Sequence, residues 1–174
     1  MTARDGASEP GAPVRRAPMS LEEAAWLYRA DEVCPKDLPM TAAEALAAGV
    51  DSPALRELAG LPRNADSRDL CDAFEQALAE LEIALPEPAP ARRHALRRLA
   101  VRFAAGEVDL AELASDIWWD MEAGTAAEQA FLELLRTCAC CSAYTLGLDE
   151  KAWKSQLRLA ALALASHSTV GPNC

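Results

Sequence analysis

Three helix-start signals constrain the fold of this chain more than any other feature of its sequence. In each signal a Ser or Thr stands three residues before a Glu, and Ala- and Leu-rich segments follow. The pairs are Ser20 with Glu23, Thr41 with Glu44, and Thr125 with Glu128. This spacing is typical of a capping box, in which both side chains accept hydrogen bonds from backbone N–H groups that the first helical turn leaves unpaired. The pattern predicts an all-α fold.

The length of 174 residues allows one domain with a substantial core. Residues 1–19 are rich in Pro, Gly, Ala and Arg and lack apolar periodicity, so we expect a disordered N-terminal tail. Residues 20–174 are expected to form a single domain, an irregular or orthogonal bundle of seven to eight helices. Three prolines within residues 86–90 predict a stiff, non-helical connector between two helical halves.

The remaining helix boundaries follow from Pro, Gly and the apolar spacing. The expected helices are about Leu21–Ala30, Ala42–Ala48, Arg68–Ile83, Ala91–Ala105, Leu110–Glu122, Ala126–Leu146 and Glu150–His167, and a short turn is expected from Pro53 to Gly60. The last helix is nearly apolar on every side between Leu159 and Ala165, which predicts a central position surrounded by other helices.

The net charge of -10 opposes general binding to nucleic acid or to an anionic membrane, because like charges repel, and it favours a basic partner. The longest apolar run is far shorter than the roughly 18 to 20 residues of a membrane span. Three of the six cysteines crowd into residues 138–141, unlike the distributed framework of a secreted disulfide scaffold. We therefore expect reduced thiols and a cytoplasmic protein.

Several segments resemble a known group of proteins. They are the sequence Ala-Leu-Arg-Glu-Leu-Ala-Gly-Leu at 54–61, the segment 74–81, and the Gly106 turn that leads to Asp-Ile-Trp-Trp at 116–119. Together they resemble small, uncharacterised all-helical proteins of high-GC bacteria, over about residues 50–120. The resemblance implies a helical fold and brings no catalytic residue.

The predicted helix Leu110–Glu122 carries a column of carboxylates. Glu112, Asp116 and Asp120 recur every four residues and so share one helix face, and the same geometry places Trp119 among them. One interpretation is an interface, since an aromatic side chain anchors a partner while carboxylates steer a basic surface toward it. The alternative is that Trp119 packs within the chain, as Trp118 is expected to do.

The predicted helix Ala91–Ala105 carries a local charge of +5 and no acid. Its arginines are Arg92, Arg93, Arg97, Arg98 and Arg102. Guanidinium groups bind carboxylate and phosphate, which makes Arg93, Arg97, Arg98 and Arg102 candidates for an anion site. The alternative is that these arginines pair with acidic neighbours inside the chain.

The cysteines allow two interpretations. Cys138 and Cys141 form a C-x-x-C pair that, with Cys34 or Cys71, could supply thiolates to zinc, or they are small core residues. Cys140 points away from the apolar face and is the candidate reactive thiol. The histidines lack the Glu-x-x-His spacing of a di-iron bundle. We predict no cofactor and no catalytic residue.

The sequence favours a non-enzymatic protein-binding module of the immunity or adaptor kind, with an acidic helical surface for a basic protein partner. Two alternatives remain open. One is a small-molecule-binding enzyme, or a subunit of one, with a pocket between the Arg-rich helix and the Cys-bearing helix. The other is a homodimeric structural or regulatory protein.

Overall fold

The computed structural model describes residues 19–110, 113, 118–137 and 142–167, and these ranges contain helices and no strand. The predicted all-α fold is confirmed. The elements are α1 (Leu21–Arg29), a short 3₁₀ helix η1 (Pro35–Asp37), α2 (Leu38–Ala47), α3 (Pro53–Gly60), α4 (Ser67–Glu80), α5 (Pro88–Ala104), α6 (Ala126–Leu135), α7 (Ser142–Thr145) and α8 (Glu150–His167). No helix within the described ranges combines the length and apolarity that crossing a membrane requires.

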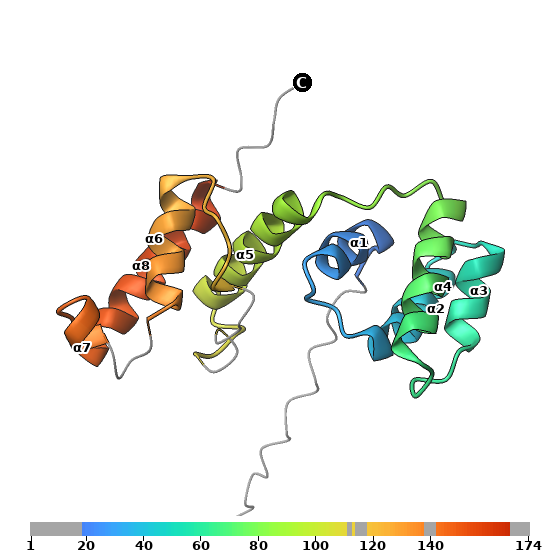
Figure 1. The fold of residues 1–174 in the computed structure, drawn as a ribbon, viewed down its shortest axis with the longest axis horizontal. Coiled ribbons are helices and arrows are strands. Elements are labelled where there is room, and N and C mark those ends of the chain that lie inside the picture. The colour runs from blue at the N-terminus through green and yellow to red at the C-terminus, as the bar shows by residue number, and fades with distance from the viewer. Residues whose placement is uncertain (1–18, 111–112, 114–117, 138–141, 168–174) are drawn as a thin grey trace, which may run out of the picture.

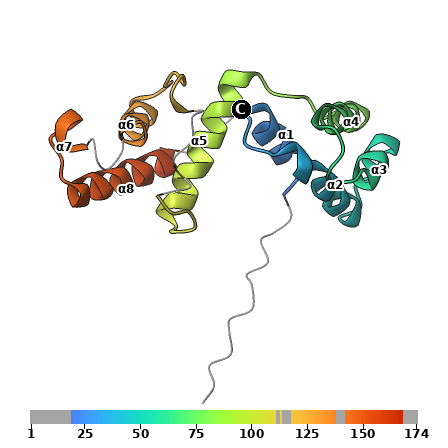
Figure 2. The same ribbon diagram turned by 60° about the horizontal axis from the view of Figure 1, so that its bottom comes forward.

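The helices gather in two groups along the long axis of the molecule. Figure 1 shows α2, α3 and α4 at one end and α6, α7 and α8 at the other, with α1 and α5 between them. The second view keeps the same order (Figure 2). In the second group α8 packs against both α5 and α6, while α1 packs against α5 and so joins the groups.

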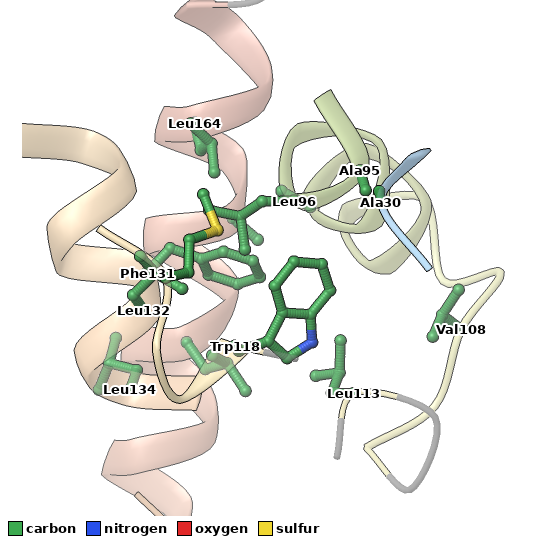
Figure 3. Packing of buried hydrophobic residues seen from close by; sticks show 14 of the residues in the cluster. Ala30, Ala95, Leu96, Val108, Leu113, Trp118, Phe131, Leu132, Leu134 and Leu164 are labelled. Carbon is green, nitrogen blue, oxygen red and sulfur yellow. The ribbon is translucent and has the colours of Figure 1, made fainter. Parts of the chain in front are cut away.

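Each group has its own hydrophobic core. The N-terminal core is built from Leu and Ala around one aromatic residue, Phe74, and Leu38, Leu55 and Leu70 are fully buried in it. The C-terminal core is more aromatic, with Phe131, Trp118 and Trp153 among its members, and Figure 3 shows Trp118 and Phe131 close together. Burial of such side chains is the main stabilising term of either core.

Helix α1 contributes to both cores. Leu21, Ala24 and Ala25 are buried in the N-terminal core, whereas Leu27 and Ala30 are buried in the C-terminal core. The two apolar groups lie along one short helix whose first turn is capped by Ser20. The chain is therefore a single helical domain with two cores that share α1.

Of the three predicted capping boxes, only the one at Thr125 has both hydrogen bonds. At Ser20 the hydroxyl accepts from the Glu23 N–H at 3.2 Å, but the Glu23 carboxylate bonds to side chains of α5. The box at Thr41 is wrong, because α2 begins at Leu38 and the Thr41 hydroxyl donates to the Asp37 carbonyl inside the helix. Pro39 fits the first turn, where no N–H partner is needed.

The prediction that residues 86–90 form a non-helical connector is also wrong for residues 88–90. Helix α5 begins at Pro88, so that Pro88 and Pro90 both lie in its first turn. The N–H groups of a first turn have no partner in the helix, and the φ angle of proline suits a helix, so proline costs little there. The non-helical segment ends at Glu87.

Two predicted helices of the C-terminal half are wrong in the described residues. Residues 118–122, the end of the expected helix Leu110–Glu122, form a turn and extended chain. The expected helix Ala126–Leu146 instead ends at Leu135, and α7 is a separate element. In both places a side chain donates hydrogen bonds to backbone carbonyl groups. Arg136 donates to Trp118 and Met121, and the indole N–H of Trp153 donates to the Leu134 carbonyl at 3.2 Å.

The predicted bounds of α8 are confirmed, but its predicted surrounded position is not. Leu157 and Leu164 are fully buried, whereas Leu159 is 65% exposed and Leu162 is 47% exposed. At 100° per residue the exposed leucines lie on the opposite side of the helix from the buried ones. Helix α8 therefore covers the core with one face and presents leucines to solvent on the other.

Candidate functional site

The Trp119 turn, defined as residues 118–121, contains two adjacent tryptophans that differ in their exposure to solvent. Trp118 is 3% exposed and packs in the C-terminal core, as the sequence predicted, whereas Trp119 is 59% exposed. Figure 3 shows the Trp118 indole within the core beside Leu113. One residue of the turn thus anchors it to the core while the next projects outward.

Arg136 holds the ends of this turn. Its Nε donates to the Trp118 carbonyl at 2.9 Å, and one of its terminal nitrogens donates to the Met121 carbonyl. Hydrogen bonds from a charged guanidinium are stronger than neutral ones, and two bonds from one group restrict the geometry of the turn. The exposed indole of Trp119 is therefore presented from a backbone that is tied to α6.

Acidic residues follow Trp119 closely along the chain. Asp120 and Glu122 are both exposed, and neither forms an ion pair within the part of the chain that the structure describes. Glu112 and Asp116 lie outside the described residues. The proximity of Asp120 to Trp119 arises from the turn itself and not from the helix that we expected there.

Four of the five arginines of α5 pair with acids of the same chain, as the second of the two interpretations predicted, and Arg93 has no ion pair among the described residues. Arg97 donates twice to Glu128 of α6, and Arg98 pairs with Glu23 of α1. Arg102 lies 3.7 Å from Glu107. Arg97, Arg98 and Arg102 therefore each have an internal carboxylate partner, and the anion-site interpretation stays a prediction.

Arg92 and Arg93 complete the set of five arginines on α5. Arg92 lies 3.9 Å from Asp31, at the limit of an ion pair. The guanidinium of Arg93 lies against Gly124, where a Cβ would come within 2.7 Å of it. Arg93 thus covers the backbone that leads into α6, which is a packing role.

Glu23 organises the contact between α1 and α5. Its carboxylate bonds to Nε2 of His94 at 2.8 Å and to Arg98, and the His94 ring packs on Trp26 with ring centroids 5.2 Å apart. Because Glu23 is also three residues from the cap Ser20, the sequence showed it only as half of a capping box. Its contact with α5 depends on residues that are distant in sequence.

A cavity of about 710 Å³ lies beside α1 and η1. Its lining includes Tyr28, Cys34, Cys71 and Arg92. Burial, a hydrogen bond to Glu75 and the neighbouring Cys71 thiol raise the pKa of Tyr28 above its ordinary range. The sequence predicted a pocket between the Arg-rich helix and the cysteines near 140. The cavity instead adjoins Arg92 and two other cysteines, which no sequence spacing connects.

The remaining predicted thiol sites lie outside the described residues. This applies to the zinc candidates Cys138 and Cys141 and to the reactive-thiol candidate Cys140. In the described ranges no three His, Cys, Asp or Glu side chains are grouped so that they could hold a metal ion, and Cys34 and Cys71 are free thiols.

The fold and the site define an all-α protein that presents an aromatic residue from an acidic, braced turn. No family model, no curated protein and no solved structure matches this chain. The resemblance to helical proteins of high-GC bacteria stays a prediction, and the function has to be argued from the residues.

Proposed function

We propose that this chain is a non-enzymatic protein-binding module that uses the Trp119 turn to bind a partner with a basic and apolar surface. One observation carries the proposal. Trp119 is 59% exposed on a turn that Arg136 braces, although its neighbour Trp118 is buried. A large aromatic side chain held in water by a structured backbone is typical of a binding anchor.

The expected energetic contribution of this anchor is substantial. Tryptophan is enriched among the interface residues whose truncation costs about 2 kcal/mol or more of binding free energy. The bracing by Arg136 adds to this, because a turn that is already ordered loses less conformational entropy when a partner binds. Trp119 therefore has both the surface and the preorganisation that an anchor needs.

The charges beside the anchor favour a basic partner. Asp120 and Glu122 have no ion pair among the described residues, and the whole chain carries a net charge of -10. Such a field speeds the approach of a positively charged surface and weakens as salt is added. Glu112 and Asp116 stay predicted members of the same surface. We place this activity in the cytoplasm, where the cysteines would stay reduced.

The test is affinity capture from the native cell lysate with wild type and Trp119→Ala as baits, at low and at moderate salt. We expect a basic protein that wild type captures at low salt and loses as salt rises, and that Trp119→Ala captures at least about tenfold less well. Met40→Ala is the matched control, because Met40 is also exposed but belongs to α2, which lies at the other end of the molecule from α6, α7 and α8 (Figure 1). Circular dichroism checks that both variants fold.

Equal capture by wild type and a folded Trp119→Ala variant would contradict the proposal. Recovery of the bait alone, for a chain that is monomeric in solution, would favour the second candidate function, a small-molecule-binding protein. The observation behind that candidate is the cavity beside Tyr28, which combines two thiols with the guanidinium of Arg92 in one concave site.

A further inference from the structure

Leu159 and Trp119 have the highest exposed fractions among the large hydrophobic side chains of the described residues, at 65% and 59%. Both belong to the C-terminal group of helices. Each stands beside charges of one sign. Acidic Asp120 and Glu122 follow Trp119 in the chain, whereas Leu159 directly follows Arg158 on α8. The molecule thus carries two exposed apolar sites with opposite local charge.

The exposed side of α8 is basic as well as apolar. The outer face of α8 is defined here as Lys151, Arg158, Leu159 and Leu162, which fall within about a quarter turn at 100° per residue. Lys151 and Arg158 have no carboxylate within ion-pair distance in the described part of the chain. The outer face therefore has the properties that we propose for the partner of Trp119.

These two sites cannot meet within one molecule. Trp118 shares a core with Leu157 and Leu164, which lie on the inner face of α8, and Figure 3 shows Trp118 and Leu164 in this core. Leu159 and Leu162 lie on the other side of the same helix. The body of α8 thus stands between its outer face and the Trp119 turn, so that only another molecule can bring the two together.

We infer that the partner is a second copy of this chain, with the Trp119 turn of one copy on the outer face of α8 of the next. This inference rests on the proposed function and specifies the partner. Because the two sites lie on opposite sides of α8, the contact is head-to-tail, and further copies can add at the Trp119 turn and the outer face that stay free at the two ends. The apolar anchors face each other, and Asp120 and Glu122 approach Lys151 and Arg158.

The net charge sets the salt dependence of such a pair. Two chains of charge -10 repel each other at long range, and about 0.15 M salt screens that repulsion beyond roughly 8 Å. The close contacts are screened less. Self-association should therefore strengthen between about 0.01 M and 0.15 M salt, whereas binding to a separate basic protein should weaken.

The test measures mass in solution by light scattering or sedimentation over a range of protein concentrations. We expect the average mass of wild type to rise above the 18.6 kDa of one chain, and past twice that value, as its concentration rises. Trp119→Ala and the double variant Leu159→Glu with Leu162→Glu should each raise the dissociation constant about tenfold or more. Met40→Glu is the matched control, since it adds a charge at an exposed apolar position of the other group and should leave self-association unchanged.

Mixing the two defective variants tests the geometry. The variant with Leu159→Glu and Leu162→Glu keeps Trp119, and the Trp119→Ala variant keeps the outer face of α8. A mixed pair therefore retains one intact contact, so the mixture should associate more strongly than either variant alone. A wild-type chain that stays monomeric, or a pair that survives Trp119→Ala, overturns the inference. If a monomeric wild type still captures a basic protein through Trp119, the proposed function holds and only the second copy is wrong.

Discussion

A glutamate carboxylate accepts hydrogen bonds at the start of a helix in each of the two groups. This carboxylate is exposed in the N-terminal group and buried in the C-terminal group. In the N-terminal group, Glu80 of α4 accepts a hydrogen bond from the Ala54 N–H at the start of α3, at 2.8 Å, and remains exposed. In the C-terminal group, Glu128 accepts from the N–H groups of Gly124 and Thr125 at the start of its own helix and is fully buried.

This difference follows from what surrounds each carboxylate. Glu80 is solvated, and its hydrogen bond joins α4 to the start of α3, 26 residues earlier in the chain. Glu128 has lost its water and instead receives two hydrogen bonds from Arg97, which ties α5 to α6. A buried carboxylate costs several kcal/mol unless such partners are present. The comparison teaches that both groups use a carboxylate to join segments distant in sequence, but that only the C-terminal group buries it and supplies an arginine to compensate for its lost water.

The largest expected effect comes from truncating the central aromatic residue of either core. Phe74→Ala and Phe131→Ala should each lower the free energy of unfolding by about 4 kcal/mol, because both side chains are fully buried. Urea denaturation measures this. Since α1 belongs to both cores, we expect one cooperative transition in each variant.

The expectation of one cooperative transition is wrong if the two groups of helices unfold separately. Three tryptophans, Trp118, Trp119 and Trp153, lie in the C-terminal group, and the fourth, Trp26, packs against the C-terminal core, so fluorescence reports on that group while circular dichroism reports on all helices. For Phe74→Ala the two signals should change together. An early loss of circular dichroism with unchanged fluorescence would show that the N-terminal core unfolds alone.

An intermediate effect is expected at the buried carboxylate. Glu128→Ala should lower the free energy of unfolding by about 3 kcal/mol, because it leaves the N–H groups of Gly124 and Thr125 unpaired and removes the partner of Arg97. Glu133→Ala on the exposed side of the same helix is the control and should change stability by less than about 0.5 kcal/mol. Similar losses in both variants, by urea denaturation, would contradict the role of Glu128.

The smallest effect concerns Glu80 and depends on pH. Hydrogen bonds from the Ala54 N–H and from Ser52 lower the pKa of Glu80 below its ordinary value of 4.5. A carboxyl group whose pKa is lower in the folded than in the unfolded state stabilises the fold at pH values above its unfolded-state pKa. This stabilisation is lost as the pH falls through the folded-state pKa. Wild type should therefore exceed Glu80→Gln in urea midpoint at pH 7, and the difference should shrink toward pH 3. A difference that is independent of pH would argue against this cap.

Sequence patterns predicted the N-terminal group more accurately than the C-terminal group. Pro53 occupies the first position of α3 and Gly60 ends it, both as expected, because these signals act on neighbouring residues. The ends of α1 and α4 lack such a signal. They are followed by Asp31 and Glu82 with φ of 61° and 57°, a conformation that usually indicates glycine.

The candidate site was predicted only in part. Trp119 and Asp120 were singled out from a helical periodicity that the turn at 118–121 does not follow. The exposure of Trp119 arises because Arg136 binds the carbonyls of Trp118 and Met121, a contact across at least 15 residues. No local pattern encodes such a contact, and the cavity beside Tyr28 was missed for the same reason.

The sequence by itself determined the helical fold class, the caps at Ser20 and Thr125, and the acidic character of the chain. These properties depend on composition and on residues three or four positions apart. Only the tertiary structure decided that four arginines of α5 pair internally, that α6 ends at Leu135 and that α8 exposes Leu159. Each of these features depends on which distant side chain contacts a backbone carbonyl, a carboxylate or an apolar face. The spacing of residues along the chain does not encode such contacts.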